Sequence, residues 1–252
     1  YNMIIISPFC RLGNNLIQLL RALSLNIRFL HHDSMDISQL KRKYPIILKN
    51  FPSVYKFNFP VKKEKITSRF WYAHDYEPLI KNKTPSTDIS DKEIVDKYIF
   101  PYIDKNINKN LCNNIDFDKD LIIHIRSGDV TPMLDKYVQP SLSFYNKIIQ
   151  ENKFRKIYII TENKQLNPVI KVLQDKYKNV NFTPRNFDDD FSILINAKYL
   201  VVSNSTLSKW LCRFNKNLKI VYSNCGWAHD KGEYEVQFTN TPSYYQLKFK
   251  NY

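Results

Sequence analysis

The sequence predicts an α/β protein in which parallel β-sheets are covered by helices. The first observation is a mostly β-branched run at residues 3–6, followed by a glycine-bearing loop and a long amphipathic segment. The second is the alternation of strand-length apolar runs with helical patterns between residues 121 and 222. Such alternation is typical of parallel sheets, because parallel strands need crossover connections. The 252 residues, 43% of them hydrophobic, suffice for one large domain or two smaller lobes.

The chain opens with an expected strand and an expected helix. Residues 3–6 end at Ser7-Pro8 and are expected to form a buried strand. After a short loop, residues 15–30 are expected to form a long helix, because apolar side chains recur on one face at helical spacing. These side chains are Leu16, Leu19, Leu20, Leu23 and Ile27.

The region that follows carries weaker signals, since Lys, Pro and aromatic residues are mixed there. Short strands are expected near residues 46–48 and 69–72. The pattern Ser90-x-x-Glu93 is that of a capping box and predicts the start of a helix. Proline lacks a backbone N–H, so Pro101 is expected to kink or end this helix.

The polar stretch 104–118 is expected to link two lobes, so the predicted domains are residues 1–115 and 116–252. The second lobe has the more regular pattern. Its expected strands are residues 121–125, 156–160, 180–182, 199–202 and 218–222, and its expected helices are 141–151, 167–177, 189–196 and 205–214. In sheets of this kind, ligands bind at the carboxyl ends of the strands.

The first candidate site is Arg11-Leu12-Gly13-Asn14-Asn15, between the first strand and the first helix. Backbone N–H groups at a helix N-terminus and the guanidinium of Arg11 suit an anion or sugar hydroxyls. An ordinary strand-to-helix turn with an asparagine cap explains the same residues, and the segment alone does not decide between the two.

The second candidate site is His124-Ile125-Arg126-Ser127-Gly128-Asp129, at the end of a buried strand. His124 and Arg126 alternate with isoleucines, so both side chains are expected on one face. Buried polar groups need partners, and Arg126 can form two parallel hydrogen bonds with a diphosphate. The alternative is a local ion pair between Arg126 and Asp129 that stabilises a turn.

The third candidate site is Ser203-Asn204-Ser205-Thr206-Leu207-Ser208, where a strand runs directly into hydroxyl residues at a helix start. Hydroxyls and N–H groups at a helix N-terminus form a phosphate site without a glycine-rich loop. Plain N-capping by the same residues is the alternative. All three segments lie where ligands bind in parallel sheets.

In this order, the three segments resemble motifs of the GDP-fucose-dependent fucosyltransferase superfamily, which includes the α-1,2-, α-1,6- and protein O-fucosyltransferases. The first resembles their G-x-x-G-N-Q segment, and His124-x-Arg126-x-Gly128-Asp129 resembles their H-x-R-x-x-D element. The stretch from Ser203 to Trp210 is similar to the S-N-S-T-F-S-x-W stretch of the α-1,2 group.

This resemblance implies a GT-B-like fold of two Rossmann-like lobes with parallel sheets and an interlobe cleft. The N-terminal lobe, residues 1–115, would lie on the acceptor side, and residues 116–252 would bind the nucleotide sugar. The implied reaction is an inverting, metal-independent transfer of L-fucose from GDP-fucose to a glycan hydroxyl, with no cofactor besides the GDP-sugar.

The resemblance also implies roles for individual residues. Arg126 would stabilise the departing GDP, and Asp135, nine residues further on, lies near where the α-1,6 group carries a glutamate base. Asp129 is expected to orient Arg126. The residues expected to bind the donor are Arg11, Gly13, Asn14, His124, Arg126, Asp129, Asp189, Ser203, Ser205 and Thr206.

Three other functions are considered beside this one. Asp188 and Asp190 could form the metal-binding D-x-D of a GT-A-type transferase, although acidic residues also favour a helix N-terminus. The net charge of +14 and 17 tyrosines suit a basic polyanion-binding protein. Because the lysines are dispersed and no nucleic-acid-binding motif is present, nucleic acid is not expected as a partner. A sugar-binding protein without catalytic activity is the third.

The sequence contains no apolar run of the roughly 18 residues that span a bilayer. No signal peptide is visible, although the chain starts at Tyr1 rather than Met. The expectation is therefore a chain without a membrane span, with the cytoplasm as the favoured location.

Overall fold

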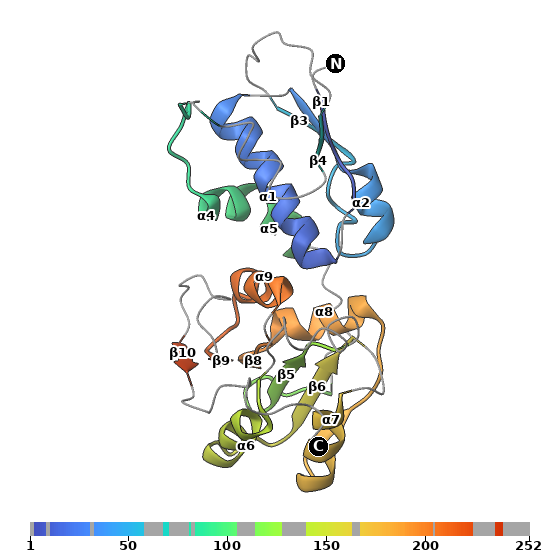
Figure 1. The fold of residues 1–252 in the computed structure, drawn as a ribbon, viewed down its shortest axis with the longest axis vertical. Helices are drawn as coiled ribbons and strands as arrows, with labels where there is room; N and C mark the ends of the chain where they lie inside the picture. The colour runs from blue at the N-terminus through green and yellow to red at the C-terminus, as the bar shows by residue number, and fades with distance from the viewer. Residues whose placement is uncertain are drawn as a thin grey trace. The chain divides into compact units, whose positions relative to one another are not determined.

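The computed structural model describes residues 3–8, 11–30, 33–57, 68–70, 81, 84–104, 114–127, 140–162, 167–203, 205–223 and 235–238. The chain divides into two compact units, Tyr1–Ile107 and Asn108–Tyr252 (Figure 1). Each unit is described by itself below.

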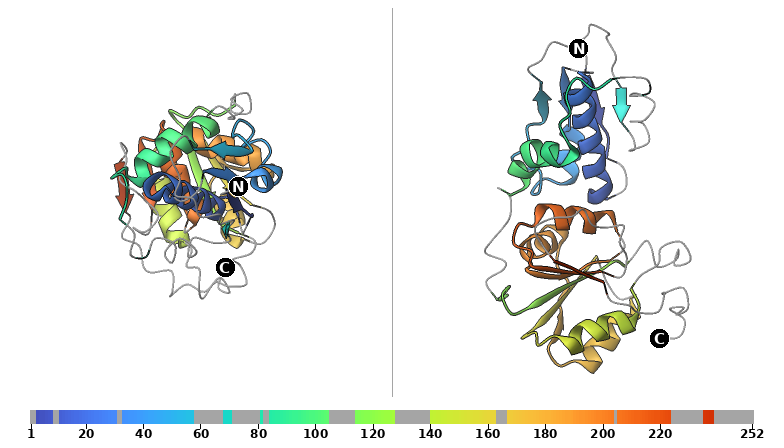
Figure 2. Two further views of the ribbon diagram at one scale, coloured as in Figure 1. Left: turned by 90° about the horizontal axis from the view of Figure 1, so that it is seen from above. Right: turned by 90° about the vertical axis from the view of Figure 1, so that its left-hand side faces the viewer.

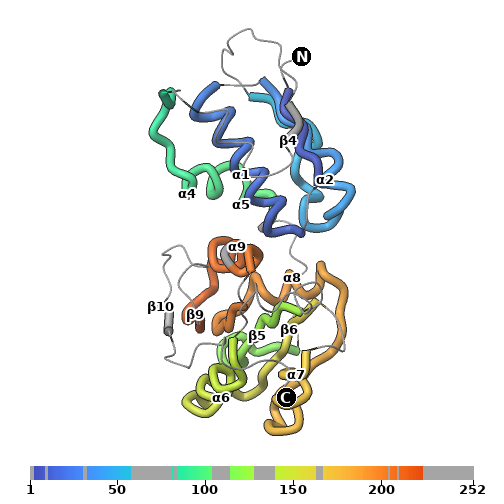
Figure 3. Tube along the Cα trace, viewed as in Figure 1, coloured from blue at the N-terminus to red at the C-terminus, as the bar shows by residue number. Residues whose placement is uncertain are grey.

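The N-terminal unit is built around one long helix and a small sheet. Its elements in chain order are β1 Met3–Ile6, α1 Leu12–Phe29, β2 Ser34–Asp36, α2 Ser38–Lys43, β3 Val54–Lys56, β4 Ser68–Phe70, α4 Asp91–Ile94, the π-helical turn η2 Val95–Ile99 and α5 Phe100–Asp104. The described strands are ordered β3-β2-β1-β4, with β1 parallel to β2 and β4 and with β3 antiparallel to β2. Helix α1 packs against α4 and η2 (Figure 3).

The predicted apolar face of α1 is buried, which confirms the helix. The helix nevertheless starts at Leu12, three residues before the predicted start, so Gly13 and Asn14 lie in its first turn rather than in a loop. It ends at Phe29, and the C-cap residue Leu30 adopts the left-handed conformation with φ 50°. Glycine usually occupies this position, because the left-handed conformation costs other residues about 1 kcal/mol or more.

The strand predicted near residues 46–48 is wrong, because this segment forms turns. Ile47 and Leu48 are buried while Ile46 is 48% exposed, so an apolar run without strand geometry still contributes to the core. Strand β4 at Ser68–Phe70 agrees with the strand predicted at 69–72. Strands β2 and β3 and helix α2 were not predicted.

The capping box at the start of α4 is confirmed. The backbone N–H of Glu93 donates to Ser90 Oγ at 3.2 Å, and the backbone N–H of Ser90 donates to the Glu93 carboxylate at 2.7 Å. Pro101 does not end the helix. The π-helical turn η2 precedes it, with the N–H of Phe100 bonded to the carbonyl of Val95, and the wider turn accommodates a residue that cannot donate.

Up to residue 223 the C-terminal unit alternates strands and helices as predicted, with bounds shifted by at most two residues, whereas its last strand, at residues 235–238, was not predicted. Its elements are β5 Leu121–Ile125, α6 Leu142–Glu151, β6 Ile157–Thr161, α7 Pro168–Lys176, β7 Val180–Phe182, α8 Phe187–Asn196, β8 Tyr199–Val201, α9 Thr206–Phe214, β9 Ile220–Ser223 and β10 Glu235–Phe238. The described strands are ordered β10-β9-β8-β5-β6-β7, and every neighbouring pair is parallel. The prediction of an α/β protein with parallel sheets is confirmed.

Helices cover both faces of this sheet. Leu121, Ile123 and Ile125 of β5 share a core with apolar residues of α6 and α7. Helix α8 packs against β5, β6 and α9, and Figure 1 shows α8 and α9 on the opposite face from α6 and α7. Figure 2 shows the same layers from the side, with the orange helices and the yellow-green helices separated by the sheet.

The helices that follow two neighbouring strands of this sheet lie on opposite faces. Strand β5 continues into α6 on one face, whereas its neighbour β8 continues into α9 on the other. In open parallel sheets such a switch point leaves a crevice at the carboxyl ends of the two strands, where ligands bind. None of the helices in the described part of the chain combines the length and the apolar character that a membrane span requires.

Candidate functional site

The candidate site lies at this switch point, at the carboxyl ends of β5 and β8. His124 is next to the last residue of β5, and Arg126 directly follows the strand. Ser203 follows β8 by two residues, and Ser205 is the N-cap of α9. Two motifs about eighty residues apart are brought together because β5 and β8 pair in register.

His124 makes the contact that joins the two motifs. Its Nδ1 lies 3.0 Å from the hydroxyl of Ser203 and 3.3 Å from the hydroxyl of Ser208. The side chain belongs to the face opposite the isoleucine core, as the alternation along β5 predicts, and the residue is only 8% exposed. The imidazole is therefore held between the end of β8 and the first turn of α9.

Ser208 organises the start of α9. Its hydroxyl donates to the carbonyl of Ser203 at 2.8 Å, and its backbone N–H donates to Ser205 Oγ at 3.1 Å. The second of these bonds is an N-cap, which the sequence pattern predicted. Ser203, Ser205 and Ser208 are all buried, while Thr206 is half-buried.

Burial, together with the smaller effect of the positive charge of Arg126, lowers the pKa of His124 from 6.5 to about 3. The imidazole is therefore neutral at neutral pH, where it acts as a hydrogen-bonding group rather than as a cation. Arg126 is half-buried, and its guanidinium carries the positive charge at this end of β5.

On the side of β5 that faces β6, polar side chains form hydrogen bonds with each other. Thr161 donates its hydroxyl to Ser127 Oγ at 2.9 Å, and the Asn167 side-chain amide donates to the same oxygen at 3.3 Å. Asn167 also caps α7 by accepting the N–H of Val169. These bonds fix the backbone that follows β5, and with it the position from which Arg126 extends.

The first turn of α8 carries the acidic residues of the sequence analysis. Asp189 accepts a hydrogen bond from the Asn186 side chain at 2.9 Å, and its backbone N–H donates to Asn186 Oδ1 at 2.8 Å. Asp190 is buried, and desolvation raises the pKa of its carboxyl to about 7, with Asp189 adding to the rise and Arg185 opposing it.

Helix geometry argues against Asp188 and Asp190 as a chelating pair. Residues two apart on an α-helix are rotated by about 200°, so their side chains leave opposite sides of α8. Burial also raises the pKa of Asp188, which disfavours the charged form that a metal needs. In the described ranges, no group of three or more His, Cys, Asp or Glu residues is arranged to hold a metal ion.

The N-terminal motif forms the start of α1 in its own unit. Arg11 is the N-cap residue, but its side chain makes no capping bond. Gly13 is buried and Asn14 half-buried. The Asn15 amide donates to the Arg11 carbonyl at 2.8 Å and to the Tyr44 hydroxyl at 3.2 Å, which ties the helix start to the segment after α2. Donor binding by Arg11, Gly13 and Asn14 stays a prediction.

Three predicted residues, Gly128, Asp129 and Asp135, lie outside the described residues. The expected orientation of Arg126 by Asp129 and the expected base Asp135 therefore stay predictions.

Ser127 and Ser208 lie within the second and third predicted segments, but no role was predicted for either of them. Ser208 stands three residues after the cap Ser205, where capping boxes place a second polar side chain, and that spacing could have indicated it. No local pattern connects Ser127 with Thr161 and Asn167, because these contacts depend on strand pairing.

No protein-family model matches this sequence, and none of the curated proteins compared with it is similar in sequence. Among solved structures, the fold is similar to that of the E. coli heptosyltransferase WaaC with ADP. The two sequences are 10% identical, the alignment covers 99% of this chain and 97% of that chain, and the TM-score is 0.55.

Two further structures align more loosely. POFUT1 in complex with GDP is 10% identical over 88% of this chain and 98% of that chain, with a TM-score of 0.45. The E. coli ADP-heptose LPS heptosyltransferase II is 10% identical over 99% and 96%, with a TM-score of 0.44. The likeness to WaaC shows that the chain has a GT-B-like fold of Rossmann-like lobes, as the sequence resemblance implied.

Proposed function

We propose that this chain is a glycosyltransferase that takes its sugar from a nucleotide-diphosphate donor, with GDP-fucose as that donor and a glycan hydroxyl as the acceptor. The observation that carries the proposal is the contact of His124 with Ser203 and Ser208. It joins the end of β5, from which Arg126 extends, to the N-terminus of α9. A guanidinium and a helix N-terminus next to each other suit a pyrophosphate.

The chemistry of transfer supports this assignment. Breaking the bond between sugar and phosphate builds negative charge on the diphosphate and positive charge on the anomeric carbon. Arg126 can donate two parallel hydrogen bonds to the phosphate oxygens, and the dipole of α9 favours the same charge. Preorganised groups of this kind contribute roughly 3–4 kcal/mol each to lowering a barrier, which allows a metal-independent reaction.

His124 would bind beside Arg126 as a neutral donor. A phosphate oxygen accepts hydrogen bonds, so the ring would carry its proton on Nε2 while the Ser203 hydroxyl donates to Nδ1 at 3.0 Å. Because the ring adds no charge, Arg126 remains the group that stabilises the departing diphosphate.

The acceptor hydroxyl would attack from the face opposite the diphosphate, which inverts the anomeric centre. Its proton would go to a general base, and we propose Asp135 for that role. We further propose that the N-terminal unit binds the acceptor glycan and that the C-terminal unit binds the donor.

The choice of GDP-fucose rests on the ordered resemblance of the three motifs to fucosyltransferases. The structurally similar WaaC was solved with ADP, so an adenine nucleotide is the comparison that any test must include. The proposal of a nucleotide-sugar transferase survives either outcome, whereas the proposal of GDP-fucose does not.

A thermal-shift screen tests both levels. The chain would be heated with GDP, GDP-fucose, GDP-mannose, ADP, ADP-heptose and UDP-GlcNAc, each at about 100 times an expected micromolar Kd, where a bound ligand stabilises by about 2.7 kcal/mol. Stabilisation by guanine nucleotides only is the expected result. Stabilisation by adenine nucleotides only would contradict the donor, and no shift with any nucleotide would contradict the transferase.

A further inference from the structure

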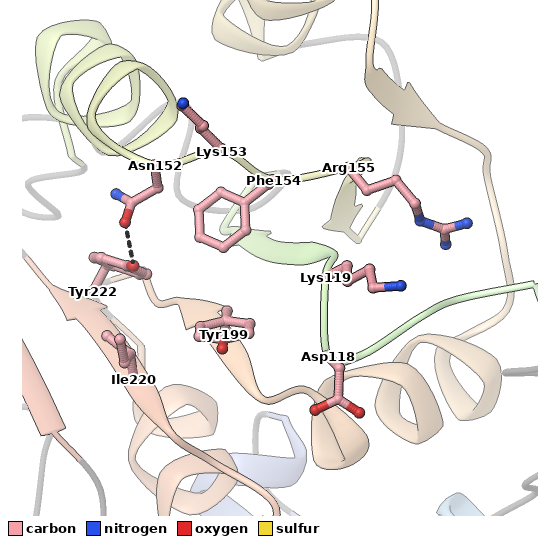
Figure 4. A pocket seen from close by; sticks show the side chains of 9 residues that line it. All are labelled: Asp118, Lys119, Asn152, Lys153, Phe154, Arg155, Tyr199, Ile220 and Tyr222. Carbon is pink, nitrogen blue, oxygen red and sulfur yellow. Dashed lines mark hydrogen bonds between the residues drawn. The ribbon is translucent and has the colours of Figure 1, made fainter.

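A pocket of about 330 Å³ opens at the amino ends of the strands of the C-terminal sheet, opposite the candidate site (Figure 4). Phe154 lies just before β6, and Tyr199 and Ile220 are the first residues of β8 and β9. Its volume lies at the lower end of the range of small-ligand sites.

Aromatic rings form the centre of this pocket. The ring centroid of Phe154 lies 5.5 Å from that of Tyr199 and 6.4 Å from that of Tyr222. Phe154 and Tyr199 are half-buried, so parts of their rings remain accessible. Tyr222 is buried and donates its hydroxyl to Asn152 Oδ1 at 3.3 Å, as Figure 4 shows. The pocket thus offers the accessible parts of two aromatic rings as an apolar surface.

The carboxylates near this pocket are already neutralised. Asp120 is fully buried and binds Arg155 at 2.6 Å. Asp118 binds Lys198 at 2.6 Å and Lys219 at 3.2 Å. Each carboxylate therefore already has a cationic partner.

Basic side chains at the same edge remain in excess. Lys119 forms an ion pair with Asp116 at 3.5 Å, whereas the single carboxylate of Asp118 faces two lysines, Lys198 and Lys219. Lys153 lines the pocket and is exposed, and no carboxylate of the described residues forms an ion pair with it. The rim of the pocket is therefore positively charged, within a chain whose net charge is +14.

We propose that this pocket binds an acidic saccharide, with a sugar ring against Phe154 and Tyr199 and its carboxylate or phosphate group near Lys153. Accessible aromatic rings favour the apolar face of a sugar, and the excess of cations favours an anionic one.

The pocket is separate from the proposed donor site. Strand β5 has five residues, so the beginning and the end of the strand lie about 16 Å apart at the usual rise per residue. The saccharide would therefore be held away from the reacting atoms, as a further unit of a longer glycan. Binding at this pocket does not depend on the proposed transfer and can be measured alone.

The test is calorimetric titration of the whole chain with tri-galacturonic acid, at about 150 mM salt to screen long-range attraction. The trimethyl ester of the same trisaccharide is the neutral control ligand, and inorganic phosphate is the control anion. Lys153→Glu reverses a charge at the rim of the pocket. Lys171→Glu makes the same change at an exposed position on α7 and is the matched control.

We expect the acid to bind more tightly than its ester or phosphate, and we expect Lys153→Glu to weaken it about tenfold, or about 1.4 kcal/mol. Lys171→Glu should change the affinity less than about twofold, because screening suppresses distant charges. Tyr199→Leu should weaken both saccharides. The thermal shift with GDP should be the same in Lys153→Glu as in the unchanged chain, which separates this pocket from the donor site.

Four results would overturn the proposal. They are equal losses in the two lysine variants, equal binding of acid and ester, phosphate binding as tight as that of the saccharide, and no binding of the acid at millimolar concentration. Loss of the GDP shift in all variants would concern the proposed function and not this pocket.

Discussion

Replacing His124 by asparagine should remove an acid-sensitive part of the stability. The pKa of the folded-state imidazole lies at about 3, against an ordinary value of 6.5. Between these values the unfolded chain takes up a proton that the folded chain refuses. The stabilising contribution is therefore fully present above pH 6.5 and is lost as the pH falls towards 3.

The magnitude follows from the two pKa values. Each pH unit within the window costs at most about 1.36 kcal/mol, and lowering the pH from 6.5 to 5.0 costs about 1.7 kcal/mol. Asp190, whose pKa lies at about 7, also titrates in this interval, so the contribution of His124 is isolated by comparing the unchanged chain with the His124→Asn variant. Burial is the larger cause of the shift, so Ser208→Ala, which removes one hydroxyl from the ring but leaves it buried, should keep most of the pH dependence.

Urea unfolding at several pH values between 5.0 and 7.5 measures how the free energy of unfolding depends on pH. Between pH 6.5 and 5.0 the His124→Asn variant should lose less stability than the unchanged chain by about 1.7 kcal/mol, whatever its stability at pH 7.5. An NMR titration should find that the His124 ring does not protonate above pH 5. Parallel stability curves for the two proteins, or a ring that titrates near pH 6, would refute the burial and neutrality of His124.

Three further predictions concern groups around the same sheet. Burial raises the pKa of Asp190 to about 7 from 3.8, so its stabilising contribution is lost as the pH rises between these values. Urea unfolding at pH 8 should therefore show that Asp190→Asn has a free energy of unfolding roughly 2–4 kcal/mol higher than the unchanged chain. This gain should vanish near pH 4. Asp120→Ala removes a buried carboxylate that accepts hydrogen bonds from Arg155 and from the backbone N–H groups of Asp116 and Lys156, and it should cost roughly 2 kcal/mol in chemical unfolding, whereas no loss would contradict a structural role. Ser205→Ala removes the N-cap of α9 and should cost about 1 kcal/mol, while Ser205→Thr should retain most of the stability.

The sequence could predict elements whose signals are local. The capping box of Ser90 and Glu93 contains its own partners, so the start of α4 was predicted to the residue. The strands after residue 121 are short apolar runs and the helices follow an apolar period of 3.6, and both signals depend only on the local sequence. The two motifs at His124 and Ser203 were also recognisable, because each ends a buried strand with polar residues.

The parts of the fold and of the candidate site that could not be predicted depend on tertiary contacts. The run Ile46-Ile47-Leu48 has the composition of a strand, yet it forms turns, because two of its side chains are buried without strand pairing. Gly13 and Asn14 are typical turn residues, but they lie in the first turn of α1. The neighbouring positions of β5 and β8, on which the candidate site depends, are a consequence of strand order, which no local pattern contains.

Asp190 illustrates the same limit at a single residue. Among three consecutive aspartates, the sequence does not indicate which one is buried, and Asp188 and Asp190 were considered as metal ligands. Their places on α8 separate the two carboxylates and bury Asp190. Its raised pKa follows from that burial and could not be predicted from the triplet itself.

The most direct test of the central claim is calorimetric binding of GDP to the unchanged chain, Arg126→Ala, Arg126→Lys and the control Arg42→Ala, whose arginine is exposed on α2. A charge-assisted bidentate contact contributes about 1.5–3 kcal/mol, so Arg126→Ala should weaken GDP binding roughly 10- to 150-fold. Arg126→Lys keeps the charge but loses the second hydrogen bond, so it should lie between, and Arg42→Ala should bind as the unchanged chain does. If Arg126→Ala binds GDP as tightly as the unchanged chain, the guanidinium at the end of β5 does not hold a diphosphate and the account is contradicted.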